Sequence, residues 1–234
     1  MNSRGRGDAI AALRRRVAAI KAVKAIEGAP ARSWRDAAPL TLGVPEIDRV
    51  LPGGGLARGG LHEVLGGHVQ GDGHPERTGI AGAALAFTAV LAARRAALAN
   101  HTAGHPKAAG GGQVLWCPSR RGLYGPGLAA FGLGAGQLIL VHGRDDQQRL
   151  WAMEEGLKCP GLAMVVGEVG RLDLGQSRRL QLAAEASGIT ALLLPRKLGQ
   201  GSDGSNSSNG LGVSAALTRW RITAQPSAPT QGYA

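Results

Sequence analysis

The stretch LGVPEIDRVLPGGGLARGGLHEVLGG, residues 42–67, decides how this chain folds. Within it, the apolar run LHEVL at 61–65 predicts a buried strand, and the glycines after it predict a tight turn. A strand that enters a glycine-rich turn and then a helix is typical of a phosphate-binding loop. The next residues, HVQGDGHPERTGIAGAALAF at 68–87, contain no Gly-Lys-Thr or Gly-Lys-Ser. The sequence therefore predicts the scaffold of a nucleotide-binding core without its main chemical part.

Predicted strands and helices alternate along the rest of the chain. After the strand at 61–65, helices are expected at 79–99, 127–132, 145–157 and 177–187, and strands at 114–117, 138–141, 162–166 and 189–194, before a last segment at 214–224. This alternation predicts an α/β fold, with a mostly parallel central sheet flanked by helices. The short runs at 138–140, 163–166 and 191–194 are almost wholly apolar, which favours central positions in the sheet.

The N-terminal region predicts a basic amphipathic helix at 8–27, as an extension of the core. Such a helix is expected either to dock on a partner or to pack on its own core. We divide the chain into a helix and linker at 1–30, a core at 31–227 with a mobile Gly/Ser/Asn-rich loop at 199–210, and a tail at 228–234. The residues of the helix that we select as partner-binding candidates are Leu13, Arg14, Val17 and Ile20.

Composition limits the class of protein. The formal net charge is +11 and the pI is about 10.9, which favours nucleic acid as a partner. Simple solubility and an acidic protein partner remain alternatives. The two cysteines, Cys117 and Cys159, have no zinc-ligand spacing, lie in apolar contexts and are expected to be buried. The sequence lacks a long uninterrupted apolar span, so we expect no membrane contact. We also expect a cytoplasmic protein and no bound metal.

Several blocks of sequence resemble the RecA/RadA superfamily and, more closely, the ImuA family of bacterial damage-inducible mutagenesis cassettes. They are L-G-x-P-E-I-D at 42–48, L-P-G-G-G-L-x-R-G at 51–59, L-H-E-V-x-G at 61–66, V-L-W-C at 114–117, L-Y-G-P-G-L-A-A-F-G-L at 123–133 and T-R-W-R-I-T-A-Q-P-S at 218–227. The resemblance covers most of the chain through the order and spacing of these blocks. It implies a RecA-like core, in which the loop at 199–210 takes the place of the second DNA-binding loop.

The resemblance also implies a function, namely a non-catalytic adaptor in SOS-induced, error-prone translesion DNA synthesis. The implied partners are an ImuB-like polymerase relative, an error-prone C-family DNA polymerase and RecA, with single-stranded DNA as a further candidate. Two other functions stay open. One is a DNA-stimulated ATPase of recombination that uses a divergent phosphate loop. The other is a cell-division inhibitor similar to SulA, a shorter protein that fits this basic chain poorly.

The phosphate loop is degenerate in the residues that would act on ATP. Gly66 and Gly67 can begin the turn, and Arg77 and Thr78 are the only candidates for the Lys and Ser/Thr roles. Glu168, after the apolar run at 162–166, is the candidate for the acidic residue that orients magnesium. We therefore expect no ATPase activity and no cofactor, with weak ATP binding at a helix N-terminus left as an alternative.

Basic residues follow several predicted strands or open helices. If those strand ends share one edge of the sheet, their charges form a basic rim that binds DNA or a partner. The alternative is a set of scattered, solvated charges. The candidates are Arg120, Arg121, Arg178, Arg179, Arg196 and Lys197.

Overall fold

The computed structural model describes residues 38–66, 82–102, 112–119, 123–159, 161–170, 172–196 and 213–224. Several predictions lie outside this part of the chain. They are the helix at 8–27, the loop at 199–210, and the domain boundaries near residues 30 and 227.

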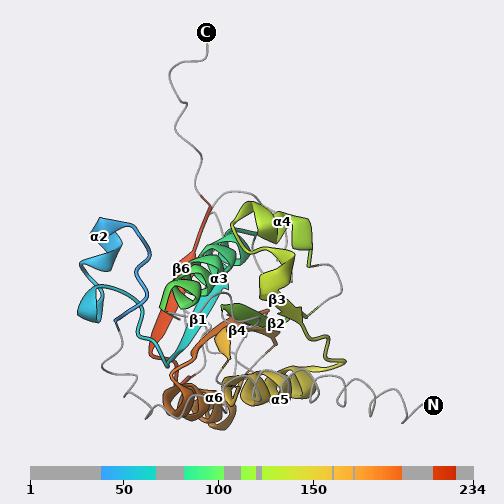
Figure 1. The fold of residues 1–234 in the computed structure, drawn as a ribbon. Coiled ribbons are helices and arrows are strands. Elements are labelled where there is room, and N and C mark those ends of the chain that lie inside the picture. Colours follow the sequence, from blue (N-terminus) through green and yellow to red (C-terminus); the bar gives the residue numbers. More distant parts are fainter. Residues whose placement is uncertain are drawn as a thin grey trace, which may run out of the picture.

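The described chain folds around a six-stranded sheet in the order β3-β2-β4-β5-β1-β6 (Figure 1). Every neighbouring pair of strands is parallel, which confirms the predicted parallel α/β fold. The strands are β1 (Leu61–Gly66), β2 (Gln113–Cys117), β3 (Leu138–Leu140), β4 (Leu162–Val169), β5 (Thr190–Pro195) and β6 (Thr218–Ile222). The helices are α2 (Pro45–Asp48), α3 (Gly82–Thr102), α4 (Gly125–Ala130), α5 (Asp146–Leu157) and α6 (Leu174–Ser187), with 3-10 turns η2 (Pro52–Gly54) and η3 (Ala135–Gln137).

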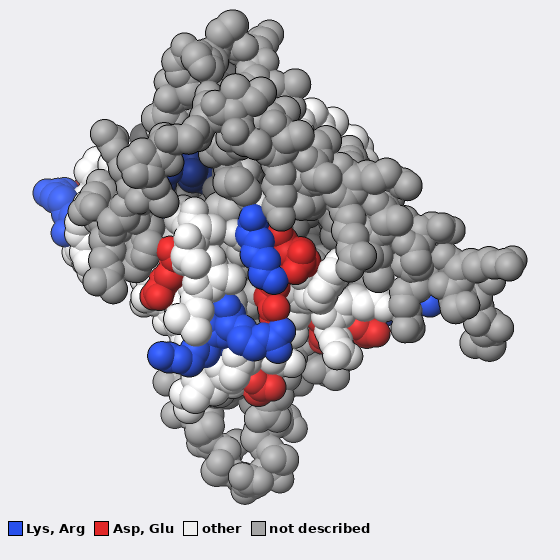
Figure 2. Space-filling model, turned by 60° about the horizontal axis from the view of Figure 1, so that its bottom comes forward, with Lys and Arg blue, Asp and Glu red and all other residues white. Residues whose placement is uncertain are grey.

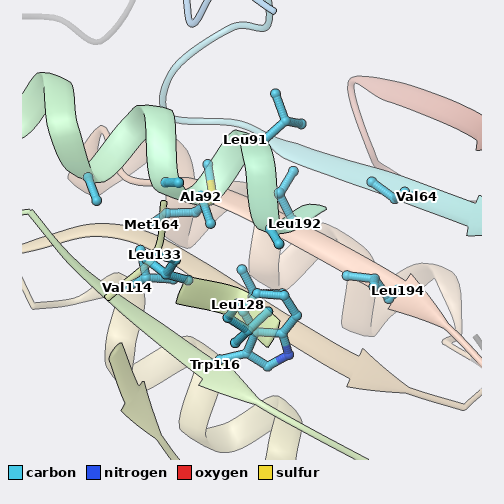
Figure 3. Close-up of a cluster of buried hydrophobic side chains, with 14 of the residues drawn as sticks. Val64, Leu91, Ala92, Val114, Trp116, Leu128, Leu133, Met164, Leu192 and Leu194 are labelled. Atoms are coloured by element: carbon cyan, nitrogen blue, oxygen red, sulfur yellow. The ribbon is translucent and has the colours of Figure 1, made fainter. Parts of the chain in front are cut away.

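Helices cover both faces of the sheet, so two apolar layers form (Figure 1). One layer lies under α3 and contains alternate strand residues such as Val64, Trp116 and Leu192 (Figure 3). The other lies under α5 and α6 and contains the intervening residues, such as Leu115 and Leu193. Because side chains alternate along a strand, strands covered on both faces must be apolar throughout. The eight residues of β4 are buried accordingly.

The helices on the second face begin at capping residues that the local sequence supplies. Asp145 caps α5, because its side chain accepts a hydrogen bond from the Gln148 backbone N–H at 2.8 Å. Asp173 caps α6 in a capping box with Gln176. This box begins α6 at Leu174, three residues before the predicted start.

The strand positions differ from the prediction in one respect. The run at 138–140 is β3, which lies at an edge of the sheet rather than in its centre. Leu140 is 37% exposed there. The short segment Pro45–Asp48 was also not predicted as helical.

Helix α3 is long and apolar enough over Gly82–Ala99 to span a membrane by length and composition alone. In the structure it packs along the sheet and contributes Ala84, Ala92 and Ala96 to the apolar layer. This is the position of an ordinary core helix. Both cysteines are buried, as expected, and unbridged.

Candidate functional site

Glu168 lies near the end of β4, and its carboxylate is held by neighbours from the β2 end. Oε1 accepts a hydrogen bond from the Trp116 indole Nε1–H at 3.0 Å. Oε2 accepts two, from the Ser119 backbone N–H at 3.0 Å and the Ser119 hydroxyl at 2.9 Å. The residue is only 7% exposed. Three donors thus occupy most of the acceptor capacity of a carboxylate that has little access to solvent.

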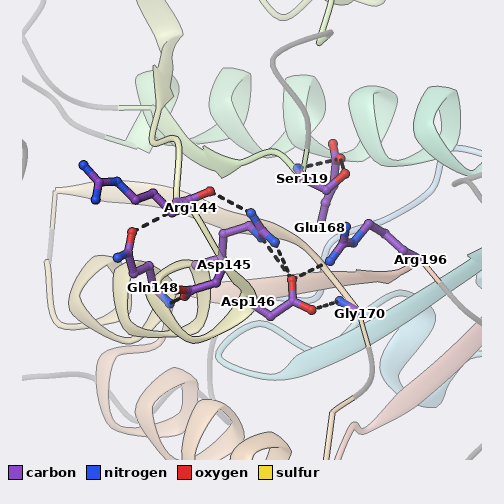
Figure 4. A network of polar contacts seen from close by, with 10 residues as sticks. Ser119, Arg144, Asp145, Asp146, Gln148, Glu168, Gly170 and Arg196 are labelled. Carbon is purple, nitrogen blue, oxygen red and sulfur yellow. Dashed lines mark hydrogen bonds and ion pairs between the residues drawn. The ribbon is translucent and has the colours of Figure 1, made fainter. Parts of the chain in front are cut away.

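Asp146, in the first turn of α5, is the centre of a second set of polar contacts at the same edge (Figure 4). Its Oδ1 pairs with Arg149 at 2.5 Å and with Arg196, which follows β5, at 2.6 Å. Its Oδ2 accepts a hydrogen bond from the Gly170 backbone N–H at 2.8 Å. Burial raises the pKa of Asp146, but the bonds from Arg149 and Gly170 and the charge of Arg196 outweigh it and hold the pKa below its usual value.

The two sets of contacts lie at the same edge (Figure 4), and together we call them the edge network: Trp116, Ser119, Asp146, Arg149, Glu168, Gly170 and Arg196. It contains two carboxylates and two guanidinium groups, so its charges balance, although both guanidinium groups pair with Asp146. Cys117 lies beside the network, and burial raises the pKa of its thiol to about 12, with opposing smaller effects from Arg149 and Glu168. The thiol therefore stays protonated and is a poor nucleophile. The edge network joins β2, β4, β5 and α5. Its Ser119 hydroxyl donates to Glu168, but the same carboxylate also accepts from Trp116 and from the Ser119 backbone.

Polar residues of the L-H-E-V and T-R-W-R-I blocks contact each other, because β1 pairs with β6. The Thr218 hydroxyl lies 2.8 Å from His62 Nδ1, and Nε2 lies 2.9 Å from the Ala57 carbonyl. Burial lowers the pKa of His62, and its bond to Ala57 opposes this shift. Glu63, also buried, accepts a hydrogen bond from Arg219 Nε at 2.6 Å. In the described chain these motif residues hold strands together.

The predicted nucleotide site is only partly described. Gly66 is the last residue of β1, while Gly67, Arg77 and Thr78 lie outside the described residues. Glu168 lies on β4, which is separated from β1 by β5. It belongs to the strand rather than following it, because β4 continues to Val169. The described residues contain no group of three or more His, Cys, Asp or Glu side chains suited to a metal ion.

The basic rim is also described in part. Arg120, Arg121 and Lys197, like the N-terminal candidates Leu13, Arg14, Val17 and Ile20, lie outside the described residues. Arg178 and Arg179 are exposed on α6, and Arg179 pairs with Glu154 of α5 at 2.6 Å. Arg196 belongs to the edge network. On the face in Figure 2, Lys and Arg lie next to Asp and Glu, so the described charges there are mixed.

Sequence reasoning missed most of the edge network. It selected Glu168 and Arg196 but not Asp146, Arg149, Ser119 or the link to Trp116. A local signal exists only for the Asp145–Asp146 pair, since acidic residues are favoured in the first turn of a helix. The other members meet through the pairing of β2 with β4 and β4 with β5.

The fold and the edge network define an α/β protein with an all-parallel sheet. At the edge where the nucleotide site was considered, the polar residues of the network bond to one another and join strands to helix α5. The chain matches no protein-family model. It is 37% identical over 192 residues to Protein ImuA of Caulobacter vibrioides, in strains NA1000 and CB 15, over 81% of this chain and 70% of that protein. The chain therefore belongs to the ImuA family.

Among solved structures, SulA from Pseudomonas aeruginosa is similar at a TM-score of 0.38 and 18% identity, over 58% of this chain and 96% of that one. That score supports no conclusion about function.

Proposed function

We propose that the chain is a non-catalytic adaptor in damage-induced, error-prone DNA synthesis. It would bind an ImuB-like polymerase relative and an error-prone C-family polymerase, with RecA and single-stranded DNA as further candidates. The role follows from membership of the ImuA family, whose members are expected to act in damage-inducible mutagenesis.

The observation that carries the non-catalytic part of the proposal is the state of Glu168. A carboxylate that orients magnesium and water needs free lone pairs and access to the ligand. Glu168 instead accepts bonds from Trp116 and Ser119 and is almost fully buried. Within the described residues, the balanced charges of the edge network support the same view, because they leave little net attraction for a polyphosphate.

The first test is titration of the purified chain with a fluorescent ATP analogue and magnesium, with and without single-stranded DNA. We expect no saturable binding, since a lost phosphate-loop lysine alone weakens ATP by roughly tenfold to a hundredfold. Binding that saturates at micromolar ATP and is lost in Arg77→Ala would refute the proposal in favour of an ATPase.

The second test concerns the adaptor role in cells. Deletion of the gene should abolish damage-induced mutation, and the wild-type gene should restore it. Glu168→Gln, if the variant is still folded at growth temperature, should restore it as well, because an adaptor does not need this carboxylate for chemistry. An undiminished mutation frequency in the deletion strain would contradict the role.

Direct contact with DNA makes a separate prediction. Binding that depends on phosphate neutralisation weakens steeply as salt rises, roughly in proportion to the number of phosphates contacted. Fluorescence anisotropy with labelled single-stranded DNA at several salt concentrations measures this slope. A flat response would leave protein partners as the sole ligands of the proposal.

A further inference from the structure

Two arginines lie at the end of the sheet opposite the edge network, near enough that the charge of Arg58 acts on Arg95. Arg58 precedes β1 by three residues, and Arg95 lies in the C-terminal half of α3. Because α3 connects the parallel strands β1 and β2, its C-terminal half returns to the strand beginnings. The side chain of Arg95 faces inward, and the residue is only 7% exposed.

Neither guanidinium has an acidic partner within the described residues. Each buried Nε atom, of Arg58 and of Arg95, lacks a hydrogen-bond acceptor. Burial, followed by the nearby charge of Arg58, lowers the pKa of Arg95 to about 10. Both groups therefore carry like charges at neutral pH. The other buried or partly buried arginines of the described chain, Arg149 and Arg196, both pair with Asp146, although the Nε of Arg196 also lacks an acceptor.

This arrangement is costly for the isolated fold. An Nε atom that is buried without an acceptor loses hydration that nothing in the protein replaces, and a neighbouring like charge adds repulsion. Buried polar groups are otherwise nearly always satisfied in folded proteins. An anion that enters between the two guanidinium groups removes both costs.

The surrounding backbone holds Arg58 in place. Leu56 and Leu40 exchange two backbone hydrogen bonds of 2.8 Å just before it. His62 Nε2 donates to the Ala57 carbonyl at 2.9 Å, and Gly59 adopts a positive φ of 69° that lets the chain turn into β1. Residue 58 is therefore fixed between two anchored positions, as expected for a preformed binding site.

We propose that Arg58 and Arg95 form a socket for a carboxylate side chain from an acidic segment of a partner protein. Guanidinium groups bind carboxylates through paired, charge-assisted hydrogen bonds. A Glu side chain is slender and suits a group as buried as Arg95 better than a phosphodiester, which carries a bulky sugar on each side. The inference rests on the proposed adaptor function for the existence of such a partner.

The neighbouring surface suits an acidic segment that also carries apolar residues. The guanidinium of Arg94 lies against Gly43, so α3 and the segment before α2 are in contact. Val44, next to Gly43, is 42% exposed, and Leu98, one turn after Arg94, is 48% exposed. Apolar side chains of the partner could pack on these two residues while a carboxylate enters the socket.

The test uses the full chain and a fluorescein-labelled peptide of alternating Leu and Glu. A matched peptide of alternating Leu and Gln and an oligothymidine single strand complete the set, and anisotropy measures binding. We expect the Leu/Glu peptide to bind more tightly than the Leu/Gln peptide. Arg58→Met should weaken the Leu/Glu peptide by about tenfold to a hundredfold, because each charge-assisted bond contributes that much. Arg95→Met should do the same.

Arg144→Met provides the control for net charge. Arg144 is exposed before α5, on the other face of the sheet, and its loss should change peptide binding little. Both socket variants should keep or gain thermal stability, since each relieves an unpaired buried charge. Arg58 is only partly buried, so Arg58→Met remains a test if Arg95→Met fails to fold.

Equal binding of the two peptides, or an equal loss in Arg144→Met, would overturn the socket. So would an effect of Arg58→Met confined to the oligothymidine strand, which would assign the pair to nucleic acid. These failures leave the adaptor proposal standing. Conversely, saturable ATP binding would refute the non-catalytic role without affecting the peptide result, because the peptide assay contains no nucleotide.

Discussion

Glu168→Gln separates a structural carboxylate from a catalytic one. The change keeps the size and shape of the side chain but replaces one acceptor oxygen by a donor NH2 group. If the Gln oxygen faces Ser119, the amide nitrogen faces the Trp116 indole N–H, and two donors oppose each other in a buried position. The reverse orientation places the NH2 group against the Ser119 backbone N–H. Neither orientation satisfies all three donors of the wild-type contacts.

The cost follows from those contacts. A hydrogen bond to a charged group contributes about 1.5–3 kcal/mol, and a neutral one about 0.5–1.5 kcal/mol. Glu168→Gln loses one charged bond and reduces the remaining ones to neutral bonds. We expect a loss of about 2–4 kcal/mol in the free energy of unfolding. For a chain of this length, that corresponds to a fall in Tm of roughly 5–15 °C.

The measurement is urea unfolding of the full chain, followed by Trp fluorescence and circular dichroism. Glu155→Gln is the matched control, because Glu155 makes an exposed pair with Lys158 at 2.8 Å. A surface pair of this kind contributes about 0–1 kcal/mol, so the control should unfold almost like the wild type.

An unchanged or increased stability in Glu168→Gln would refute the reasoning. Catalytic carboxylates are commonly held at the expense of stability, and their neutralisation then stabilises the fold. That outcome would return Glu168 to the nucleotide site.

Three further predictions concern groups already described. Burial lowers the pKa of His62, so the unfolded state binds a proton more readily, and the free energy of unfolding should fall as pH drops below about 6.5. In a plot of the urea midpoint against pH, His62→Gln should flatten this part of the curve. The pKa of Asp146 is also lowered, so its contribution to stability is present above the usual carboxyl pKa of about 3.9 and is lost as pH falls through the pKa in the folded state. Asp146→Asn should therefore show a shallower acid transition by circular dichroism. A thiol-reactive disulfide dye should label neither Cys117 nor Cys159 in the native chain and both in urea, and rapid native labelling would contradict their burial.

The elements that sequence predicted best are those whose signals are local. The strand β4 and the helix α5 follow from an apolar run and from the Asp145 cap, both within a few residues. The capping box of α6 was overlooked because Gly175 and Arg178 obscure the start of its apolar periodicity. The edge position of β3 could not be predicted from three apolar residues, since it depends on which strands pair.

The candidate site required contacts that are far apart in sequence. Gly167 interrupts the apolar run of β4, so Glu168 was expected beyond the strand. Gly167 in fact belongs to β4, where a side chain would collide with Met153 of α5. Trp116 and Ser119, the partners of Glu168, lie about fifty residues earlier, and no local pattern predicts their contact with it. The same reason hides the approach of Arg58 to Arg95.

The position of β1 between β5 and β6 has a consequence for how the chain is made. Leu61 of β1 pairs with Ala191, and Gly66 pairs with Ile222. A ribosome therefore releases this buried strand long before either neighbour exists, and contacts so distant in sequence form slowly. Until β5 and then β6 emerge, the apolar side chains of β1 lack their neighbours and are exposed in the nascent chain, and pairing with β6 completes the described sheet.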